Sequence, residues 1–354
     1  MNATTTVLRA ATIGAGKISE EHLRFLSASP RARLVGVCDI SPAVADFAAR
    51  KFNAQAAYTD YARMLADARP DIVHILTPAA THPRLVSDCL NAGAHVIVEK
   101  PVAPTHGQFM ELWNLAQSKD RRLVEDHNYR FNAPVLTIEK LVNDGTLGEV
   151  REVEVRMSLP LRAPGGRYAD TSLPHSSHAL PAGVLHEFVT HLCYLALRFM
   201  PAVERVAARW SNQDSDGLFK FDDLDAMIFA GAVHGRIRFS SAGGPDCFVL
   251  TVRGTRGWAS TDLFQPYVRV VAPRGGRRSS GPIHLIAEGW EMLGAGFNGF
   301  RNRVMQRTAY EGLRTFLERT YDALCRGDEP PVSFADMDRV SRLIDAMVDE
   351  ANRI

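Results

Sequence analysis

The sequence predicts an α/β fold, with an N-terminal doubly wound parallel sheet and a C-terminal α+β domain whose open sheet is largely antiparallel. Two observations lead to this prediction. In the first 125 residues, short apolar runs alternate with amphipathic stretches, the pattern of parallel strands that helices cover on both faces. After Asn128, apolar and polar residues alternate within the runs, which is the period of a strand with one face in water.

In the N-terminal half, strands are expected at residues 8–13, 34–38, 71–76 and 95–98. Helices are expected at residues 17–28 and 81–91. A further helix is expected from Ser41-Pro42 onward, because serine is a good N-cap and proline is favoured at the first helical position. These elements predict a first domain over residues 1–127.

In the C-terminal half, a helix is expected at about residues 133–142 and a strand at 150–157, where valine and glutamate alternate. Further strands are predicted at 205–210, 226–232, 235–240, 248–253 and 267–271, and two long amphipathic helices at about 301–326 and 334–352. The second domain is therefore expected to span residues 128–354, with terminal helices able to pack back on the first domain.

Composition narrows the classes of function. Hydrophobic residues make up 46% and charged residues 23% of the chain, which is typical of a globular protein. The net charge of +1 argues against a nucleic-acid-binding surface, and no apolar run of about 18 residues predicts a membrane span. The first four residues show no secretion signal, and the five cysteines lie far apart, without metal-ligand spacing. We therefore expect a cytoplasmic protein with reduced thiols.

A glycine-rich turn, Gly14-Ala15-Gly16-Lys17-Ile18-Ser19, lies between the first predicted strand and the first helix. Glycines allow close approach of a pyrophosphate to a helix N-terminus, whose N–H groups favour anions. Asp39 ends the second strand, where an acid binds the adenosine ribose, and no arginine follows it to accept a 2′-phosphate. The pattern predicts a Rossmann domain that binds NAD rather than NADP through Gly14, Gly16, Lys17, Ile18 and Asp39. The alternatives are a turn without a ligand and Asp39 as an N-cap.

The charged pair Glu99-Lys100 follows an apolar strand directly and precedes Pro101. At the carboxyl end of a strand it lies on the ligand edge of an open α/β sheet. Lys100 there is able to hydrogen-bond a substrate oxygen and stabilise developing alkoxide charge. A surface ion pair is the alternative.

Together these motifs resemble the glucose–fructose oxidoreductase/myo-inositol dehydrogenase (Gfo/Idh/MocA) family. The resemblance runs in order over roughly residues 7–200 and includes Thr77-Pro78, His82, Tyr129-Arg130-Phe131 and the segment 145–150. It implies NAD(P)-dependent oxidation or reduction at a secondary alcohol or ketone of a sugar or cyclitol. It also implies that Thr77, Pro78, His82, Glu99 and Lys100 line the cofactor, and that the protein is a homo-oligomer, a dimer or a tetramer.

The family's other catalytic element is a helix with the pattern Gly-x-x-x-Asp-x-x-x-His. Here it corresponds to Gly183 through His191, with Glu187 in the place of the aspartate, Val189 in that of a usual glycine and Tyr194 in that of a common second aspartate. Residues four apart share a helix face. The resemblance therefore assigns His191 as the proton acceptor, Lys100 as the group that polarises the oxygen, and Glu187 as the residue that orients them.

A metal site on this helix is disfavoured. His186 and His191 are five residues apart, which turns them by about 140° at 100° per residue, so they do not share a face. No metal is expected, and His186 is interpreted as a packing residue or as a residue that supports the site from behind.

The loop 161–182, rich in glycine, proline and histidine, precedes the helix. Loops of this length are often functional. Its residues Arg167, Tyr168, His175 and His178 are candidate substrate contacts, with solvated loop residues as the alternative, and Asn128 and Arg130 are expected to border the cleft. The run 274–281 is interpreted as an exposed hairpin tip.

These observations favour an NAD-dependent dehydrogenase that acts on a small sugar-like substrate. The alternative from another class is an NAD(P)-binding regulator or sensor that has lost turnover, since one fold supports many functions.

Overall fold

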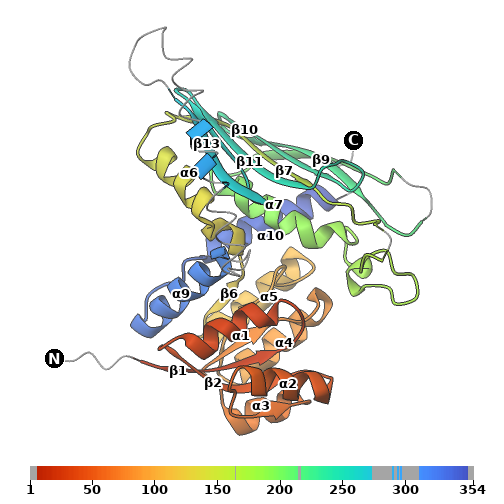
Figure 1. The fold of residues 1–354 in the computed structure, drawn as a ribbon, viewed down its shortest axis with the longest axis vertical. Helices are drawn as coiled ribbons and strands as arrows, with labels where there is room; N and C mark the ends of the chain where they lie inside the picture. Colours follow the sequence, from red (N-terminus) through yellow and green to blue (C-terminus); the bar gives the residue numbers. More distant parts are fainter. Residues whose placement is uncertain are drawn as a thin grey trace, which may run out of the picture. The chain divides into compact units, whose positions relative to one another are not determined.

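The computed structural model describes residues 6–163, 165–213, 217–272 and 311–349, together with positions 289, 290, 293, 294 and 296. The predicted hairpin tip at 274–281, and residues 301–310 and 350–352 of the two predicted C-terminal helices, lie outside the described residues. The chain divides into two compact units (Figure 1). The first comprises residues 1–128 and 313–341, and the second comprises residues 129–312 and 342–354.

The first unit contains a parallel sheet with the strand order β3-β2-β1-β4-β5-β6. Its strands are β1 (Leu8–Ile13), β2 (Ala32–Cys38), β3 (Ala57–Tyr58), β4 (Ile72–Ile75), β5 (His95–Val98) and β6 (Leu123–Glu125). The order reverses between β1 and β4, and open α/β sheets bind their ligands beside the carboxyl ends of strands at such a point.

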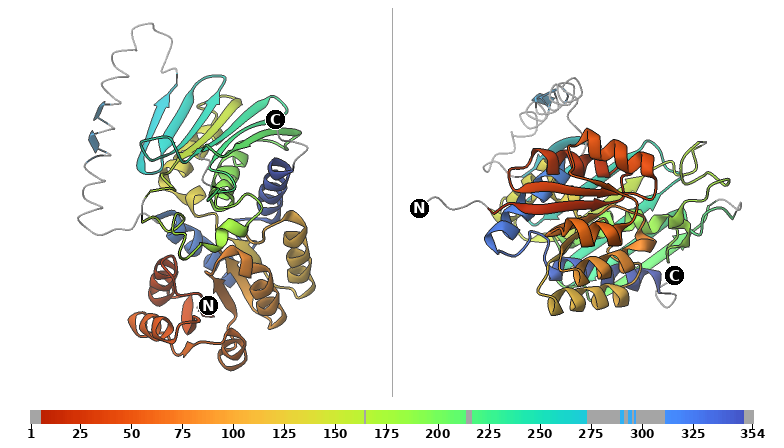
Figure 2. Two further views of the ribbon diagram at one scale, coloured as in Figure 1. Left: turned by 90° about the vertical axis from the view of Figure 1, so that its right-hand side faces the viewer. Right: turned by 90° about the horizontal axis from the view of Figure 1, so that it is seen from below.

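Helices cover both sides of this sheet (Figure 2). They are α1 (Ser19–Ala28), α2 (Pro42–Lys51), α3 (Tyr61–Ala68), α4 (His82–Asn91), α5 (His106–Ser118) and α9 (Glu311–Arg326). All four residues of β4 are buried, which explains why the strand has no polar face in the sequence. The predicted doubly wound sheet is confirmed. The sequence did not indicate β3 and β6, because runs of two and three residues are too short to show a period.

The second unit contains a seven-stranded sheet with the order β13-β12-β11-β7-β10-β9-β8. Its strands are β7 (Val150–Ser158), β8 (Arg205–Ser211), β9 (Asp223–Ala230), β10 (Val233–Ser240), β11 (Cys247–Gly254), β12 (Trp258–Asp262) and β13 (Gln265–Val271). β7 and β10 pair in parallel and all other neighbours pair antiparallel. The predicted largely antiparallel sheet is confirmed, although β12 was not predicted.

One face of this sheet is apolar and carries the helices. Val155 of β7 pairs with Ile237 of β10 and Leu250 of β11, and all three side chains are fully buried. Helix α7 (Leu185–Leu197) packs on β7 and β10, and α6 (Ala133–Asn143) packs on β12 and β13. The opposite face carries exposed charged residues such as Arg156 and Arg236. The alternation seen in the sequence therefore results from a sheet that helices cover on one side.

The last helix, α10, spans Phe334–Val348. Among the described residues, no helix is both long enough and apolar enough to cross a membrane.

Candidate active site

The glycine-rich turn has the geometry of a phosphate-binding loop. Gly14 has a φ of +95°, and a Cβ there would lie 2.8 Å from the carbonyl oxygen of Leu76, so a side chain is excluded on two counts. Gly16 and Lys17 are exposed just before α1, and a Cβ at Gly16 would meet no atom within 4 Å. The turn therefore fits the pyrophosphate of a dinucleotide, which the helix N-terminus attracts.

Asp39 ties the glycine-rich turn to the end of β2. Its two carboxylate oxygens accept hydrogen bonds from the backbone N–H groups of Ala15, at 2.8 Å, and Ser41, at 2.9 Å. Ser41 precedes α2 as expected, but its own side chain makes no capping bond. Asp39 thus combines a structural role near α2 with a negative charge beside the turn, where the ribose of a bound dinucleotide would lie.

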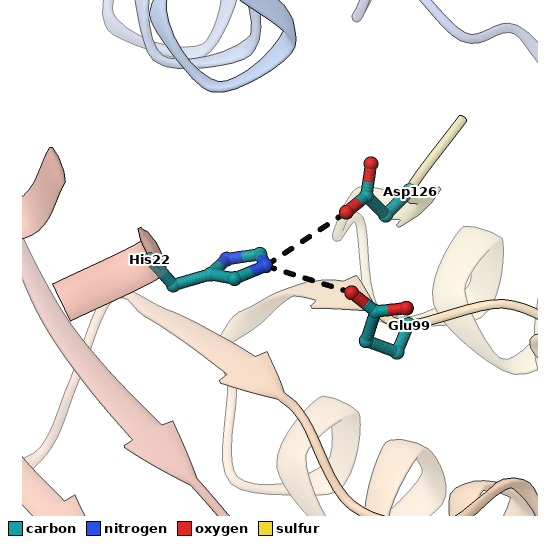
Figure 3. Close-up of side chains that lie close together, drawn as sticks. All are labelled: His22, Glu99 and Asp126. Atoms are coloured by element: carbon teal, nitrogen blue, oxygen red, sulfur yellow. Dashed lines mark ion pairs between the residues drawn. The ribbon is translucent and has the colours of Figure 1, made fainter. Parts of the chain in front are cut away.

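Glu99, at the end of β5, belongs to a buried polar cluster with His22 of α1 and Asp126 after β6 (Figure 3). The Nε2 atom of His22 lies 3.7 Å from a Glu99 oxygen and 3.8 Å from an Asp126 oxygen. Burial and the nearby Glu99 carboxylate hold the pKa of Asp126 well above its usual value. Burial opposes ionisation of Glu99 too, but His22 and Lys100 hold its pKa below the usual value. Glu99 is therefore the charged carboxylate of the pair, and it lies next to Lys100 in the chain.

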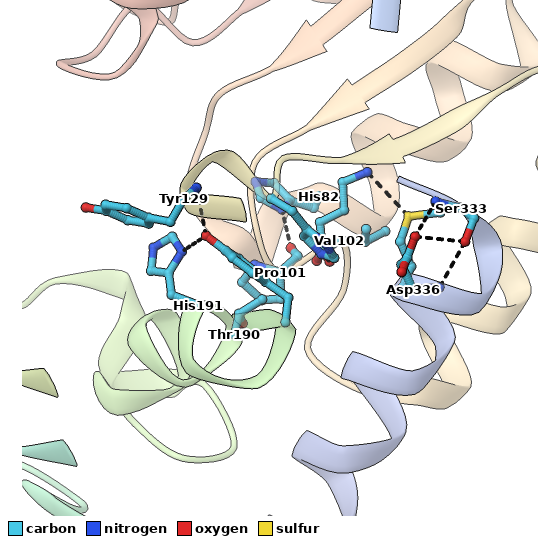
Figure 4. Close-up of polar contacts among 12 residues, drawn as sticks. His82, Pro101, Val102, Tyr129, Thr190, His191, Ser333 and Asp336 are labelled. Carbon is cyan, nitrogen blue, oxygen red and sulfur yellow. Dashed lines mark hydrogen bonds and ion pairs between the residues drawn. The ribbon is translucent and has the colours of Figure 1, made fainter. Parts of the chain in front are cut away.

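Two further buried histidines hold the segment that follows Glu99. Both ring nitrogens of His82 contact backbone carbonyls, that of Pro101 at 2.7 Å and that of Thr77 at 2.8 Å (Figure 4). The Glu125 carboxylate accepts a hydrogen bond from the Val102 N–H at 2.8 Å, and His127 lies 2.5 Å from its other oxygen. The backbone directly after Lys100 is thus held at two successive residues, Pro101 and Val102.

His191 lies on α7, where its Nδ1 atom is 2.8 Å from the Tyr194 hydroxyl. The backbone N–H of Tyr129 donates a hydrogen bond to the same hydroxyl at 3.2 Å. The Tyr129 ring meets the His191 ring edge-on, with centroids 5.0 Å apart. The histidine is therefore oriented by a tyrosine, which is able to donate or accept, at a position where the resembled family often has an aspartate.

Glu187 anchors the preceding loop to α7. Its carboxylate accepts hydrogen bonds from the hydroxyls of Tyr168, at 2.8 Å, and Ser177. Arg167 stacks over the Tyr168 ring, and His178 contacts the Tyr168 carbonyl at 3.0 Å. His175 contacts Ser177 at 2.6 Å. The sequence assigned the orienting role to Glu187, but in the structure the hydroxyl on His191 Nδ1 belongs to Tyr194.

The remaining predicted residues are placed as follows. Asn128 and Arg130 are buried, each 8% exposed, and Thr77 lies 2.7 Å from the Thr81 hydroxyl. Pro78 is exposed, and Ile18 immediately precedes α1. His186 is 1% exposed, in agreement with a packing role.

Sequence reasoning missed the buried groups behind these residues. His22, Asp126 and His127 were not singled out, although a histidine in a helix and an acid-histidine pair after a strand were visible. No spacing rule connects His22 to Glu99, since only the doubly wound sheet brings α1 and the ends of β5 and β6 together.

Comparisons with known proteins agree with this fold. The fold is that of a Rossmann-type oxidoreductase, and residues 8–127 match the family model of an oxidoreductase family with an NAD-binding Rossmann fold. Residues 135–260 match the GFO/IDH/MocA C-terminal domain. The chain therefore belongs to the Gfo/Idh/MocA family, and the resemblance and the assignment to an oxidoreductase family are confirmed.

Two named relatives and one solved structure are similar to the chain. D-glucoside 3-dehydrogenase of Escherichia coli is 28% identical over 248 residues, 68% of this chain and 69% of that protein. Inositol 2-dehydrogenase of Rhizobium meliloti is 28% identical over 173 residues, 47% of this chain and 52% of that protein. The WlbA dehydrogenase of Bordetella pertussis, solved with NADH and UDP-GlcNAcA, has a TM-score of 0.78 at 18% identity and covers 98% of this chain and 95% of that one. Two further relatives are matched over only 41% and 45% of their length.

Proposed function

We propose that the protein is an NAD-dependent dehydrogenase that acts on a secondary alcohol, or the corresponding ketone, of a sugar or cyclitol. The observation that carries this proposal is the fixed lysine: Lys100 follows β5 directly, and His82 and Glu125 hold the backbone of the next two residues, Pro101 and Val102. The named relatives act on a glucoside and an inositol, which supports the substrate class. NAD, when bound, accepts or supplies the hydride, and the glycine-rich turn fits its pyrophosphate.

In this proposal the proton of the substrate hydroxyl passes to His191, and the Lys100 ammonium stabilises the negative charge that develops on the oxygen. Tyr194 orients His191 through Nδ1. Its hydroxyl suits both directions of reaction, because Nδ1 carries a proton both in the neutral ring that accepts at Nε2 and in the charged ring that returns the proton, so Tyr194 accepts from Nδ1–H in both states. Glu187 acts indirectly by anchoring the loop that carries Arg167, Tyr168 and His178, which we propose as substrate contacts together with Asn128 and Arg130.

The function is tested by NAD+ reduction, followed at the absorbance of NADH, against a panel of sugars, inositols and sugar acids. The proposal predicts turnover of at least one polyol. Tight NAD binding without turnover of any compound would instead favour the regulator or sensor.

Replacing Asp39 by asparagine is expected to narrow the preference for NAD over NADP by about tenfold, or about 1.4 kcal/mol. The charged carboxylate repels a 2′-phosphate, whereas the isosteric amide removes the charge and keeps one oxygen for the backbone contacts. Asp39→Ala also loses those contacts and should weaken NAD itself. Titration of both cofactors measures this effect, and an unmodified protein that binds both equally would refute the assignment.

Replacing Tyr194 by phenylalanine is expected to lower kcat about five- to tenfold, because His191 loses the hydrogen bond that orients it, worth about 1 kcal/mol. The pH profile of kcat should also move, since the hydroxyl contacts the titrating ring. Tyr267→Phe, on β13, is the control. Unchanged kcat and pH profile would show that Tyr194 does not orient His191.

We further propose a cytoplasmic homo-oligomer whose interface is the face of the second unit's sheet opposite α7. The five cysteines are free thiols, which suits a reducing compartment. The charged residues of this face include Arg236, paired with Asp225, and they suit a polar interface. Light scattering at micromolar concentration should give a dimer or tetramer, and a strict monomer would contradict the interface.

A further inference from the structure

A chain of buried polar side chains runs through the first unit behind Glu99. The Tyr321 hydroxyl of α9 lies 3.0 Å from Nε2 of His74 on β4, and the Nδ1 atoms of His74 and His22 are 2.9 Å apart. All three side chains are fully buried. The chain ends where His22 Nε2 faces the carboxyl groups of Glu99 and Asp126 (Figure 3). The proposed reaction assigns no role to these three residues.

The contacts allow two directions of proton donation along the chain. Burial and the proximity of His22 hold the pKa of His74 well below its usual value, so this ring is neutral and carries one proton. If Tyr321 donates to Nε2 of His74, then His74 Nδ1–H donates to His22 Nδ1, and a neutral His22 carries its proton on Nε2. In the reverse direction, a neutral His22 would aim the lone pair of Nε2 at the carboxyl groups.

The charges at the end of the chain favour the first direction. Glu99 is the charged carboxylate of the cluster, and an N–H is attracted to it where a lone pair is repelled. Burial holds the pKa of Tyr321 well above its usual value, so its hydroxyl keeps the proton that it donates. Three of the four ring nitrogens then have a matched hydrogen-bond partner, and the fourth, His22 Nε2, faces the carboxyl oxygens at 3.7 and 3.8 Å.

We propose that Tyr321, His74 and His22 form a one-way hydrogen-bond chain that positions the Glu99 carboxylate and, through it, Lys100. This inference rests on the proposed function, because Lys100 is a catalytic group only if the protein is a dehydrogenase. His22 is a positioning residue, since it acts through Glu99. The raised pKa of Asp126 favours its protonated form, so the charge of Glu99 is the one that acts on its chain neighbour Lys100.

The alternative interpretation of the His22, Glu99 and Asp126 side chains is a metal site, because their atoms have the spacing of metal ligands. One ligand atom from each of His22, Glu99 and Asp126 lies within 4.8 Å of the others, a grouping found among the described residues. The Lys100 ammonium already supplies a positive charge next to Glu99. A cation would moreover need a lone pair on His22 Nε2, the opposite of the proposed direction.

The direction is measured without any activity, so its outcome is independent of the proposed function. Long-range proton–nitrogen NMR spectra of the full chain with 15N-labelled histidine report which ring nitrogen carries the proton. Signals are assigned with His22→Gln and His74→Gln. The expected result is His74 protonated at Nδ1 and His22 at Nε2. Tyr321→Phe should shift the Nε2 signal of His74, whereas Tyr61→Phe, which removes a hydroxyl bonded to Asp88, should not.

Kinetics test whether the chain acts on Lys100. His22→Leu should lower kcat about tenfold with little change in KM. The basic limb of the pH profile of kcat should move to lower pH by about one unit, because Glu99 without the His22 N–H stabilises the positive charge of Lys100 less. His22→Gln, which keeps an N–H, should restore most of kcat. The groups that face the cluster are Glu99, Asp126, Lys100, His82 and Glu125.

Three results would overturn the proposal: reversed tautomers, a His22 ring protonated on both nitrogens, or a stoichiometric divalent metal in the purified protein. Equal kcat profiles for His22→Leu and the unmodified enzyme would also refute the link to Lys100. If no compound is turned over, the proposed function fails, while the NMR result still decides the direction of the chain.

Discussion

Replacing His191 by alanine is expected to lower kcat by about 10²–10⁴-fold, the contribution of a positioned general base. The expectation follows from the site, where the ring is 8% exposed, held at Nδ1 by Tyr194 and flanked by Tyr129. NAD affinity should change little, because the glycine-rich turn belongs to the other unit of the chain. Steady-state kinetics and cofactor titration on the same preparation separate the two effects.

The control for His191 is His234→Ala, which removes an exposed histidine of β10. Added imidazole should restore part of the activity of His191→Ala, since it supplies the missing base, and a purely structural loss would not respond. Undiminished turnover of His191→Ala would refute the assignment of the base.

Replacing Lys100 by methionine is expected to lower kcat by about 10²–10³-fold, the usual cost of removing one donor that stabilises an oxyanion. Methionine keeps an unbranched side chain as far as Cε and removes only the ammonium end, so the backbone held by His82 and Glu125 should not change. Lys100→Arg keeps the positive charge and should retain more activity than Lys100→Met if the role is electrostatic.

Lys119→Met, at an exposed position after α5, is the matched control for Lys100 and should behave as the unmodified protein. Equal activities of Lys100→Met and Lys119→Met would show that Lys100 takes no part in the reaction. A loss of folding in Lys100→Met alone, visible by circular dichroism, would instead assign Lys100 a structural role.

The fold was largely predictable because its signals are local. The apolar runs at β1, β2, β4 and β5 and the alternation in β7 and β10 reflect burial on two faces or on one. The short strands β3 and β6 were not predicted, because they are strands through pairing with their neighbours and not through a pattern in their own sequence.

The site was predictable only where a motif is continuous in sequence. Glu99-Lys100 and the glycine-rich turn are of this kind, whereas the hydrogen bond of His191 is not. Glu187 and Tyr194 both lie one helical turn from His191, and spacing does not distinguish them. The packing of side chains makes the difference that spacing does not show: the hydroxyls of Tyr168 and Ser177 donate to the Glu187 carboxylate, and the Tyr194 hydroxyl contacts the imidazole. The chain from Tyr321 to His22 joins residues 247 positions apart at one contact and has no local signature at all.

Isotope transfer is the most direct test of hydride transfer between NAD and a sugar or cyclitol. A substrate found in the panel is prepared with deuterium at the carbon that bears the reacting hydroxyl, and the NADH formed is analysed by mass spectrometry. We expect one deuterium in the nicotinamide ring for each turnover, none without enzyme, and about 10²–10³-fold less label with Lys100→Met over the same time. NADH that carries no deuterium, or a protein that binds NAD but transfers no label from any sugar, inositol or sugar acid, would contradict it.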